Sequence, residues 1–312
     1  MLFFVAAVAA GEGRGATIVL KTSWAKKYQN RLSIDSKVTI TALNKGKGDD
    51  GDKHAGSRLN GVGLPMVAEI LNGHAAAQKE AVDALKPGTQ PEKDIYGAWR
   101  LWFEHPPAGG GIQCQSFGKT VPAICANQSF GGADSNPAHS FEIHPVFAVN
   151  NIPVGRSSLI LTPANESVKT TEQAFAHYTG ANKVLTVVRS GTALTLTSIV
   201  VTHNYARMHI RVTEARKPTT RAKDGTVDGG FLLADWLGAD ETQVLKAGVR
   251  MFYFRDSGPG DALETAAQGD EFIIVGMPRL NIEEVLRRTE TQSTITIPLP
   301  YEFVVVALLQ IL

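Results

Sequence analysis

The stretch KVTITAL, residues 37–43, opens the pattern that decides the fold. Val38, Ile40 and Ala42 alternate with threonines, so in an extended chain the apolar side chains share one face. This period of two is typical of a strand with one buried face. The stretch therefore predicts a β-strand, and the segments that follow it show what the strand belongs to.

Three more strand patterns follow, and one helical pattern interrupts them. The strand patterns are PMVAEIL (65–71), IYGAWRLWFEH (95–105) and FEIHPVFAV (141–149). The segment HAAAQKEAVDALKPG (74–88) is rich in helix formers and ends at Pro87-Gly88. The order β, β, α, β, β predicts a small OB-like barrel with one inserted helix in a domain spanning residues 11–155, although a plain α+β sheet is also allowed. The long loop 106–138 contains six glycines and four prolines and has no periodicity.

The second half of the chain is also rich in strand patterns. They include KVLTVVRS, TALTLTSIVVTH, ARMHIRVTEA, GVRMFYFRD, DEFIIVGMPRL and YEFVVVALLQ. Several short strands with turns between them predict an antiparallel β-sandwich or barrel over residues 156–312. The whole chain is therefore expected to be mainly β, a β-rich α+β protein, with two domains and no visible internal repeat.

Composition excludes several classes of protein. The chain has 312 residues, 43% hydrophobic and 20% charged, with a net charge of +1. These values are typical of a folded globular chain, and the net charge does not indicate nucleic-acid binding. Locally, lysines and arginines cluster in residues 21–47 and 207–223. These two stretches either bind a polyanionic ligand or are solvated surface.

The N-terminus and the cysteines indicate export. Residues 2–10 are apolar and resemble the hydrophobic part of a signal peptide, so residues 1–10 are interpreted as a truncated export signal; a first strand is the alternative. No stretch reaches the ~20 apolar residues of a transmembrane helix. Cys114 and Cys125 are expected to form a local disulfide. A secreted or periplasmic location follows, with the cytoplasm as the alternative.

The loop DDGDKH, residues 49–54, is the first candidate for chemistry. Asp50, Asp52 and His54 occupy alternating positions, and such side chains converge on divalent cations. The alternative is a solvated acidic turn. The Asp-Gly-Asp sequence beside OB-like strands resembles the thermonuclease family, but Lys53 replaces that family's threonine and its paired arginines have no counterpart. No residue role is transferred.

The strand WRLWFEHP, residues 99–106, is the second candidate. Arg100, Trp102 and Glu104 share one face of an extended chain, and Trp99 lies on the other. Indole rings and a guanidinium form a platform on which flat ligands stack. Core aromatic residues with an Arg–Glu pair at the rim are the alternative. On either view, the two tryptophans are expected to differ, one buried and one partly exposed.

The strand HSFEIHP, residues 139–145, is the third candidate. Period two places Glu142 and His144 on one face and His139, Phe141 and Ile143 on the other. Burying the two apolar residues turns Glu142 and His144 toward Arg100 and the DDGDKH loop. His139 is expected to stay outside this group unless a bulge brings it in.

Two functions remain open. The first is an exported binding or accessory protein with its ligand site on the N-terminal barrel, formed by Trp99, Trp102 and Glu104. The second is a metal-dependent hydrolase of the phosphoesterase or nuclease type. In the hydrolase, Asp50, Asp52, His54 and His144 would hold the metal, Glu69 or Glu142 would be the general base, and Arg100 would stabilise an anionic transition state. Ligands more than ~8 Å apart could not share one ion, whose bonds are about 2.0–2.6 Å long.

Overall fold

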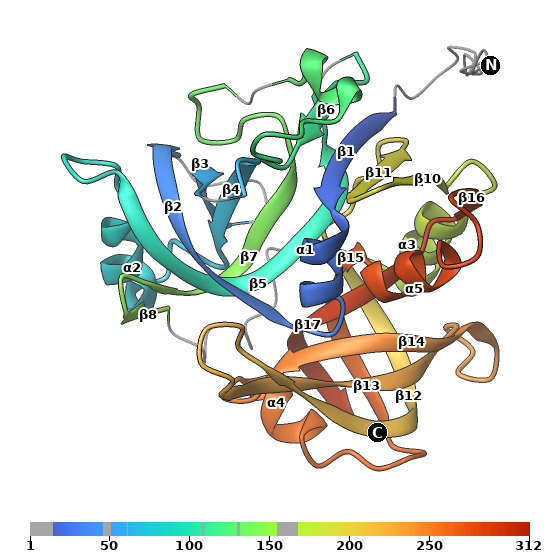
Figure 1. The fold of residues 1–312 in the computed structure, drawn as a ribbon. Coiled ribbons are helices and arrows are strands. Elements are labelled where there is room, and N and C mark those ends of the chain that lie inside the picture. The colour runs from blue at the N-terminus through green and yellow to red at the C-terminus, as the bar shows by residue number, and fades with distance from the viewer. Residues whose placement is uncertain (1–14, 46–50, 61, 108, 130–131, 155–167) are drawn as a thin grey trace.

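The computed structural model describes residues 15–45, 51–60, 62–107, 109–129, 132–154 and 168–312. The predicted export signal at residues 1–10 and the predicted metal ligand Asp50 lie outside this part of the chain. Strands dominate and the helices are short, which confirms the prediction of a mainly β protein (Figure 1). No helix within the described residues is both long enough and apolar enough to cross a membrane.

Five strands close into a first barrel around KVTITAL. They are β2 (Ser33–Leu43), β3 (Lys53–Leu59), β4 (Pro65–Ile70), β5 (Glu92–His105) and β7 (His139–Val149). They pair in the order β4-β3-β2-β5-β7, and a parallel pairing of β4 with β7 closes the ring. The 3₁₀ turn η1 (Ala76–Gln78) leads into α2 (Lys79–Ala84) between β4 and β5. This is the strand order of an OB fold, so the predicted OB-like barrel with one inserted helix is confirmed.

Burial along β2 shows why its sequence forms this strand. Val38 and Ile40 are buried in the core, whereas Lys37 and Thr41 are exposed. The alternation matches the period of the strand, so one face of β2 packs inside the barrel and the other meets solvent. The short strand β8 (Ile152–Pro153) extends the same sheet beyond β7.

Five later strands form a second barrel with the same order. They are β12 (Tyr205–Thr220), β13 (Val227–Leu237), β14 (Val244–Phe254), β15 (Glu271–Leu280) and β17 (Tyr301–Ile311). The helix α4 (Gly258–Leu263) lies between β14 and β15, as α2 does between the third and fourth strands of the first barrel. Of the two predicted forms, sandwich or barrel, the barrel is present. Its β14–β17 pair is parallel, because an odd number of strands cannot alternate in direction all the way around a ring.

A third sheet takes strands from both halves of the sequence. It contains β1 (Ala16–Lys21), β6 (Ile112–Cys114), β10 (Val184–Ser190), β11 (Ala193–Ser198) and β16 (Thr294–Pro298). The predicted boundary at residue 155 falls outside the described residues, and the division into two domains stays a prediction. Within the long loop 106–138, β6 and the 3₁₀ turn η2 (Ala123–Asn127) are joined by the Cys114–Cys125 disulfide, which confirms the predicted pairing.

Three helices and one short strand complete the fold. They are α1 (Thr22–Tyr28), α3 (Thr171–Thr179), α5 (Ile282–Arg288) and β9 (Val168–Lys169), which pairs with β12. The helix α3 begins at a capping box, in which the Thr170 side chain accepts from the Gln173 amide and the Gln173 side chain accepts from the Thr170 amide. In α5, Asn281 caps the first turn in the same way by accepting from the Glu284 amide.

The two barrels pack against each other through an apolar cluster and two arginines. The apolar cluster contains Leu32, Leu71, Tyr96, Ala98 and Phe147 from the first half and Tyr205, Phe231, Phe252, Phe254, Val275, Met277, Val304, Val306 and Ala307 from the second. Arg100 donates from Nε to the carbonyl oxygen of Pro278 at 2.9 Å. Arg279 donates back to the carbonyl oxygen of Trp99 at 3.2 Å. Arg100 thus binds the residue before Arg279, and Arg279 binds the residue before Arg100. These two hydrogen bonds join the barrels.

Candidate functional site

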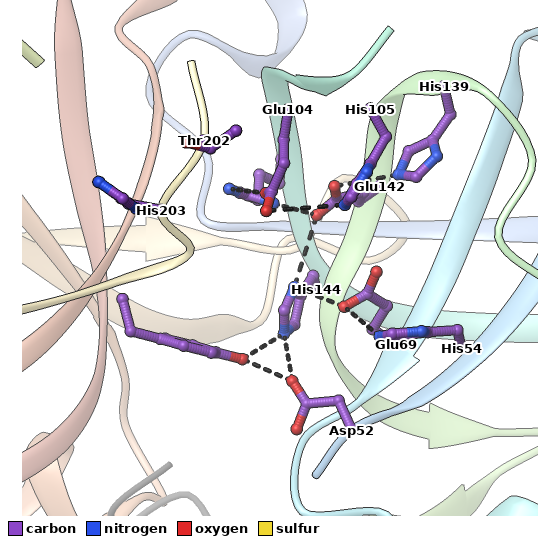
Figure 2. Close-up of polar contacts among 12 residues, drawn as sticks. Asp52, His54, Glu69, Glu104, His105, His139, Glu142, His144, Thr202 and His203 are labelled. Carbon is purple, nitrogen blue, oxygen red and sulfur yellow. Dashed lines mark hydrogen bonds and ion pairs between the residues drawn. The ribbon is translucent and has the colours of Figure 1, made fainter. Parts of the chain in front are cut away.

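The stretch HSFEIHP begins β7, and its central side chains divide by face as predicted. Phe141 and Ile143 are buried in the main apolar core. Glu142 and His144 lie on the outer face of the barrel, where His144 contacts Tyr205 of the second barrel (Figure 2). Both are almost completely buried, with exposures of 2% and 0%. The docking of the second barrel therefore covers a polar face of the first.

Arg100 is fully engaged by partners within this junction. Its Nη1 donates to Glu142 at 2.6 Å, its Nη2 donates to Glu104 at 3.0 Å, and its Nε donates to Pro278. Burial alone would raise the pKa of Glu142, but Arg100 and His139 outweigh it and hold this pKa well below its usual value. With its nitrogens so engaged, Arg100 balances buried carboxylates. The stabilisation of an anionic transition state, which the hydrolase hypothesis assigns to Arg100, stays a prediction.

His144 lies between carboxylates on both sides of its ring. Its Nδ1 is 3.1 Å from Glu69 Oε2 and 3.5 Å from Glu142 Oε2, although neither contact is aligned as a hydrogen bond. Its Nε2 is 3.3 Å from Asp52 Oδ2 and 2.9 Å from the Tyr205 hydroxyl. Burial disfavours the charged ring, but the carboxylates outweigh it and raise the pKa of His144 well above its usual value. The site thus attracts positive charge, either a proton or a cation.

Cross-strand pairing of β3 with β4 brings Glu69 and His54 into the same site. The two residues are register partners, with His54 Nε2 3.6 Å from Glu69 Oε2. Asp52 lies just before β3 and accepts hydrogen bonds from Tyr205 and from the Asn72 amide. One ligand atom from each of Asp52, Glu69 and His144 lies within 4.8 Å of the others. These residues therefore meet the distance required for one shared ion, and Asp50 stays outside the described chain.

His139 joins the site, so the prediction that it stays outside is wrong. Its Nε2 lies 3.1 Å from Glu142 Oε1, and its Nδ1 lies 2.6 Å from the Pro137 carbonyl oxygen. The pairing of β5 with β7 is irregular between Leu101 and His105. From the pair Leu101–Phe141 to the pair His105–His139, the chain advances four residues on β5 but two on β7. The extra residues lie on β5, and beside this irregular stretch the His139 ring reaches Glu142, three positions along β7.

The expected difference between Trp99 and Trp102 is also wrong. Both are buried, with exposures of 0% and 1%. The Trp99 ring packs against Trp24 of α1 and lies 4.0 Å from the Arg279 guanidinium, while Trp102 packs against Tyr178 of α3. The strand β5 is therefore covered on both faces, and neither indole offers a surface for ligand stacking.

Glu104, the third predicted ligand-binding residue, lies at the edge of the same cluster. Its side chain is 9% exposed and bonds to Arg100, and its other carboxylate oxygen lies 3.6 Å from His105 Nε2. Figure 2 shows Glu104 on the side of the cluster toward Thr202, and His105 beside His139. Its carboxylate therefore adds to the negative charge around Arg100.

The two basic stretches of the sequence meet in a pocket of about 530 Å³ between the barrels. Its lining includes Lys27, Lys37, Arg221, Lys223, Tyr96 and Phe147. Arg221 stacks 4.1 Å over the Tyr96 ring and pairs with Asp35, and Lys37 pairs with Asp94 at 3.6 Å. The other two lysines have no carboxylate partner among the described residues. The pocket therefore carries an excess of positive charge.

Tyr205 is the site residue that sequence reasoning missed. It begins β12, and its hydroxyl donates to Asp52, which lies 153 positions away in the sequence. No local sequence pattern therefore predicts the contact. No protein-family model matches the chain, and a search of curated proteins found no significant match.

Proposed function

We propose that this protein is a binding protein in which Asp52, Glu69 and His144 hold a divalent cation where its two barrels meet. Two carboxylates and one imidazole suit Zn²⁺ and similar first-row ions. A metal-bound imidazole gives one ring nitrogen to the ion, and a carboxylate orients its other nitrogen. His144 has a carboxylate near each ring nitrogen, so either nitrogen can take either role. The cation would thereby connect the outer face of β7 with the start of β3.

The observation that carries the proposal is a group of buried carboxylates around His144, with ligand atoms of Asp52, Glu69 and His144 within 4.8 Å of one another. Asp52, Glu69 and Glu142 have exposures of 0%, 4% and 2%, and Glu104 adjoins them. Arg100 pairs with Glu104 and Glu142 of this group. Carboxylates this deeply buried need charged or hydrogen-bonding partners, and a cation held among their oxygens is one such partner.

Metal analysis of the purified protein tests this directly. We expect about one ion per chain for a site with one ligand set, and loss of that ion in the His144→Ala and Asp52→Asn variants. His105→Ala is the matched control, because its imidazole pairs with Glu104 at the exposed edge. Thermal unfolding with and without a chelator supplies a second readout, since an ion bound to the native state raises the Tm. Metal-free protein whose Tm does not respond to added Zn²⁺ or Mn²⁺ would contradict the proposal.

A metal-dependent hydrolase is the second candidate. It is favoured by the ligand types, which leave positions for water on the ion, and by Glu142 as a base beside them. Burial of His144 at 0% exposure weighs against it, because a substrate must reach the ion. Metal-loaded protein should be assayed with a chromogenic phosphodiester. Turnover that disappears in His144→Ala but persists in His105→Ala would establish hydrolysis, and a loaded but inactive protein would leave binding as the function.

The ligand that we propose for the first barrel is anionic and binds in the 530 Å³ pocket. Lys27 and Lys223 carry the charge that no described carboxylate balances, and Tyr96 under Arg221 supplies a flat wall. A polyanion should bind more weakly to a Lys27→Met/Lys223→Met variant, and its affinity should fall as salt is raised. Nucleic acid is one such polyanion, and heparin is a second probe that separates charge from base recognition.

We further propose a secreted or periplasmic location, which the Cys114–Cys125 disulfide supports. Disulfides persist in oxidising compartments and are rare in the cytosol. Alkylation of free thiols in freshly lysed source cells should leave both cysteines unmodified. Complete alkylation of both would instead favour the cytoplasmic alternative.

A further inference from the structure

A second pocket, of about 270 Å³, lies on the second barrel, away from the carboxylate–histidine site. It is bounded by β14, by α5 and by the turn that leads from β16 to β17. Its polar lining is Lys246, Arg250, Asn281, Glu284, Arg288 and Tyr301. Its volume is enough for a small ligand, and its charged and polar side chains determine which class of ligand it favours.

Lys246 places a partly buried side chain with an ammonium group in this pocket. The Nζ atom lies 3.4 Å from the centroid of the Tyr301 ring, so the amine sits directly over the ring face. Among the described residues, no carboxylate pairs with it, although Glu284 acts on it from a distance. Burial lowers the pKa of Lys246 to about 8, because water no longer stabilises the charge as it does at the surface. An uncompensated buried cation is costly, and a bound anion would remove that cost.

Tyr301 adds an unused hydrogen-bond donor at the same place. The residue is 2% exposed, and its hydroxyl oxygen has no hydrogen-bond partner in the described structure. Buried hydroxyl groups are almost always paired, so an unpaired one needs an explanation. A ligand oxygen bound in the pocket would supply the missing acceptor.

The other charges of the pocket do not cancel that of Lys246. Glu284 is the single carboxylate of the lining, and it is bound by Arg287 at 2.5 Å and by Arg288 at 2.8 Å. Arg250 pairs with Glu302 at 3.2 Å from the side of the barrel junction. Glu284 is shared by two arginines, and Glu302 is shared by Arg250 and Arg279, so neither carboxylate is left to balance Lys246.

We propose that this pocket binds a small phosphate-bearing ligand, with Lys246 Nζ and the Tyr301 hydroxyl as donors to the phosphate oxygens. A phosphate offers several strong acceptors and up to two negative charges, which match one cation and one free hydroxyl donor. The volume exceeds that of a phosphate ion, so a small phosphomonoester fits the space as well as free phosphate does. The site is independent of the cation site and of the anionic pocket between the barrels.

The test measures protection of Lys246 from a reactive anionic aldehyde. Pyridoxal phosphate condenses with accessible lysine amines of low pKa, and borohydride reduction makes the adduct stable for peptide mapping. We expect preferential labelling of Lys246, with inorganic phosphate and phenyl phosphate reducing it and acetate at equal ionic strength leaving it unchanged. The two phosphates distinguish a site for the free ion from a site for a monoester.

Calorimetric titration with the tighter of the two phosphates then assigns the donors. Lys246→Met should weaken binding by more than about 10-fold and Tyr301→Phe by about 5- to 10-fold, because each removes one bond to a charged group. Lys217→Met is the matched control, since that lysine is exposed and pairs with Glu214. Thermal unfolding confirms that each variant is folded. The proposal is overturned if phosphate leaves the labelling unchanged, or if folded Lys246→Met protein binds phosphate as tightly as the parent.

Discussion

His144 on β7 and Val304 on β17 occupy the same position in two barrels of the same topology. Each lies two residues after the glutamate that pairs with the buried arginine of its own barrel. Val304 lies opposite Phe252 on the neighbouring parallel strand, where His144 has Glu69. The second barrel therefore fills with apolar side chains the positions that carry carboxylate and imidazole in the first. Polar groups at these positions are not needed to build the barrel, which favours a role in binding.

Making the first barrel resemble the second should separate stability from cation binding. We expect the double variant Glu69→Met/His144→Leu to fold and to contain no metal. In the presence of a chelator, its free energy of unfolding should be equal to that of the parent or higher by up to about 4 kcal/mol. Apolar residues often replace buried ion pairs without loss of stability. Urea unfolding with chelator present and metal analysis without it give the two readouts.

The single variant His144→Ala is the comparison for the double variant. It removes the ring between the carboxylates and leaves them buried, so it should cost about 3–5 kcal/mol. A double variant that is less stable than His144→Ala would show that Glu69 and His144 serve the fold itself.

Arg100 should be essential to stability through its charge and also through its geometry. Arg100→Met leaves Glu142 and Glu104 buried without their guanidinium, at an expected cost of about 3–5 kcal/mol in the free energy of unfolding. Arg100→Lys restores the charge but cannot reach three acceptors in fixed directions, so its cost should lie between those of Met and the parent. Urea unfolding of the three proteins checks this order, and equal stability of Lys and Met would refute the geometric part.

Trp99 and Trp102 should respond differently to the same substitution. The Trp99 indole Nε1 donates to the Arg31 carbonyl oxygen at 2.7 Å, whereas Trp102 Nε1 has no hydrogen-bond partner in the described structure. Replacement by phenylalanine should therefore cost about 1–2 kcal/mol more at Trp99 than at Trp102. Replacement by alanine should be severe at both positions, about 3–5 kcal/mol, because both side chains are core. Equal losses for the two phenylalanine variants would count against the hydrogen bond.

Stability should rise from pH 8 to pH 10 because of Lys246. Its pKa is about 8 in the folded protein and 10.5 for a free side chain, so in this range the unfolded chain binds more protons. The expected gain is on the order of 1–2 kcal/mol, absent below pH 8, where both states are protonated. Above pH 10 the buried Tyr301, whose pKa burial raises, opposes the trend. Of the charged groups that face Lys246, Glu284 has a lowered pKa and stays ionised throughout this window, and the others are the guanidinium groups of Arg250 and Arg288.

Denaturation at closely spaced pH values, compared between the parent and Lys246→Met, isolates this contribution. The slope between pH 8 and pH 10 should be smaller in the variant, and the variant should be the more stable protein at pH 7. An identical slope in both proteins would mean that the lysine is solvated in the folded state.

The sequence by itself determined the features that depend on local periodicity and spacing. The alternation in KVTITAL and the helix pattern at 74–88 predicted the first barrel and its inserted helix, since side-chain direction in a strand follows from position alone. The same rule turned Glu142 and His144 away from Phe141 and Ile143. The two cysteines in one loop were enough to predict their disulfide.

Only the tertiary structure decided which of these faces meet. Tyr205 reaches Asp52 across 153 residues, and the repeat of barrel topology is invisible in a chain whose equivalent positions hold His144 and Val304. Trp99 and Trp102 became core because the second barrel, α1 and α3 cover both faces of β5. His139 reaches Glu142 beside an irregular stretch of the β5–β7 pairing. Periodicity states the direction of a side chain relative to its own strand. The docking of elements that are distant in sequence decides what lies in that direction. The contacts that stabilise this docking form between distant segments, so no single local segment predicts them.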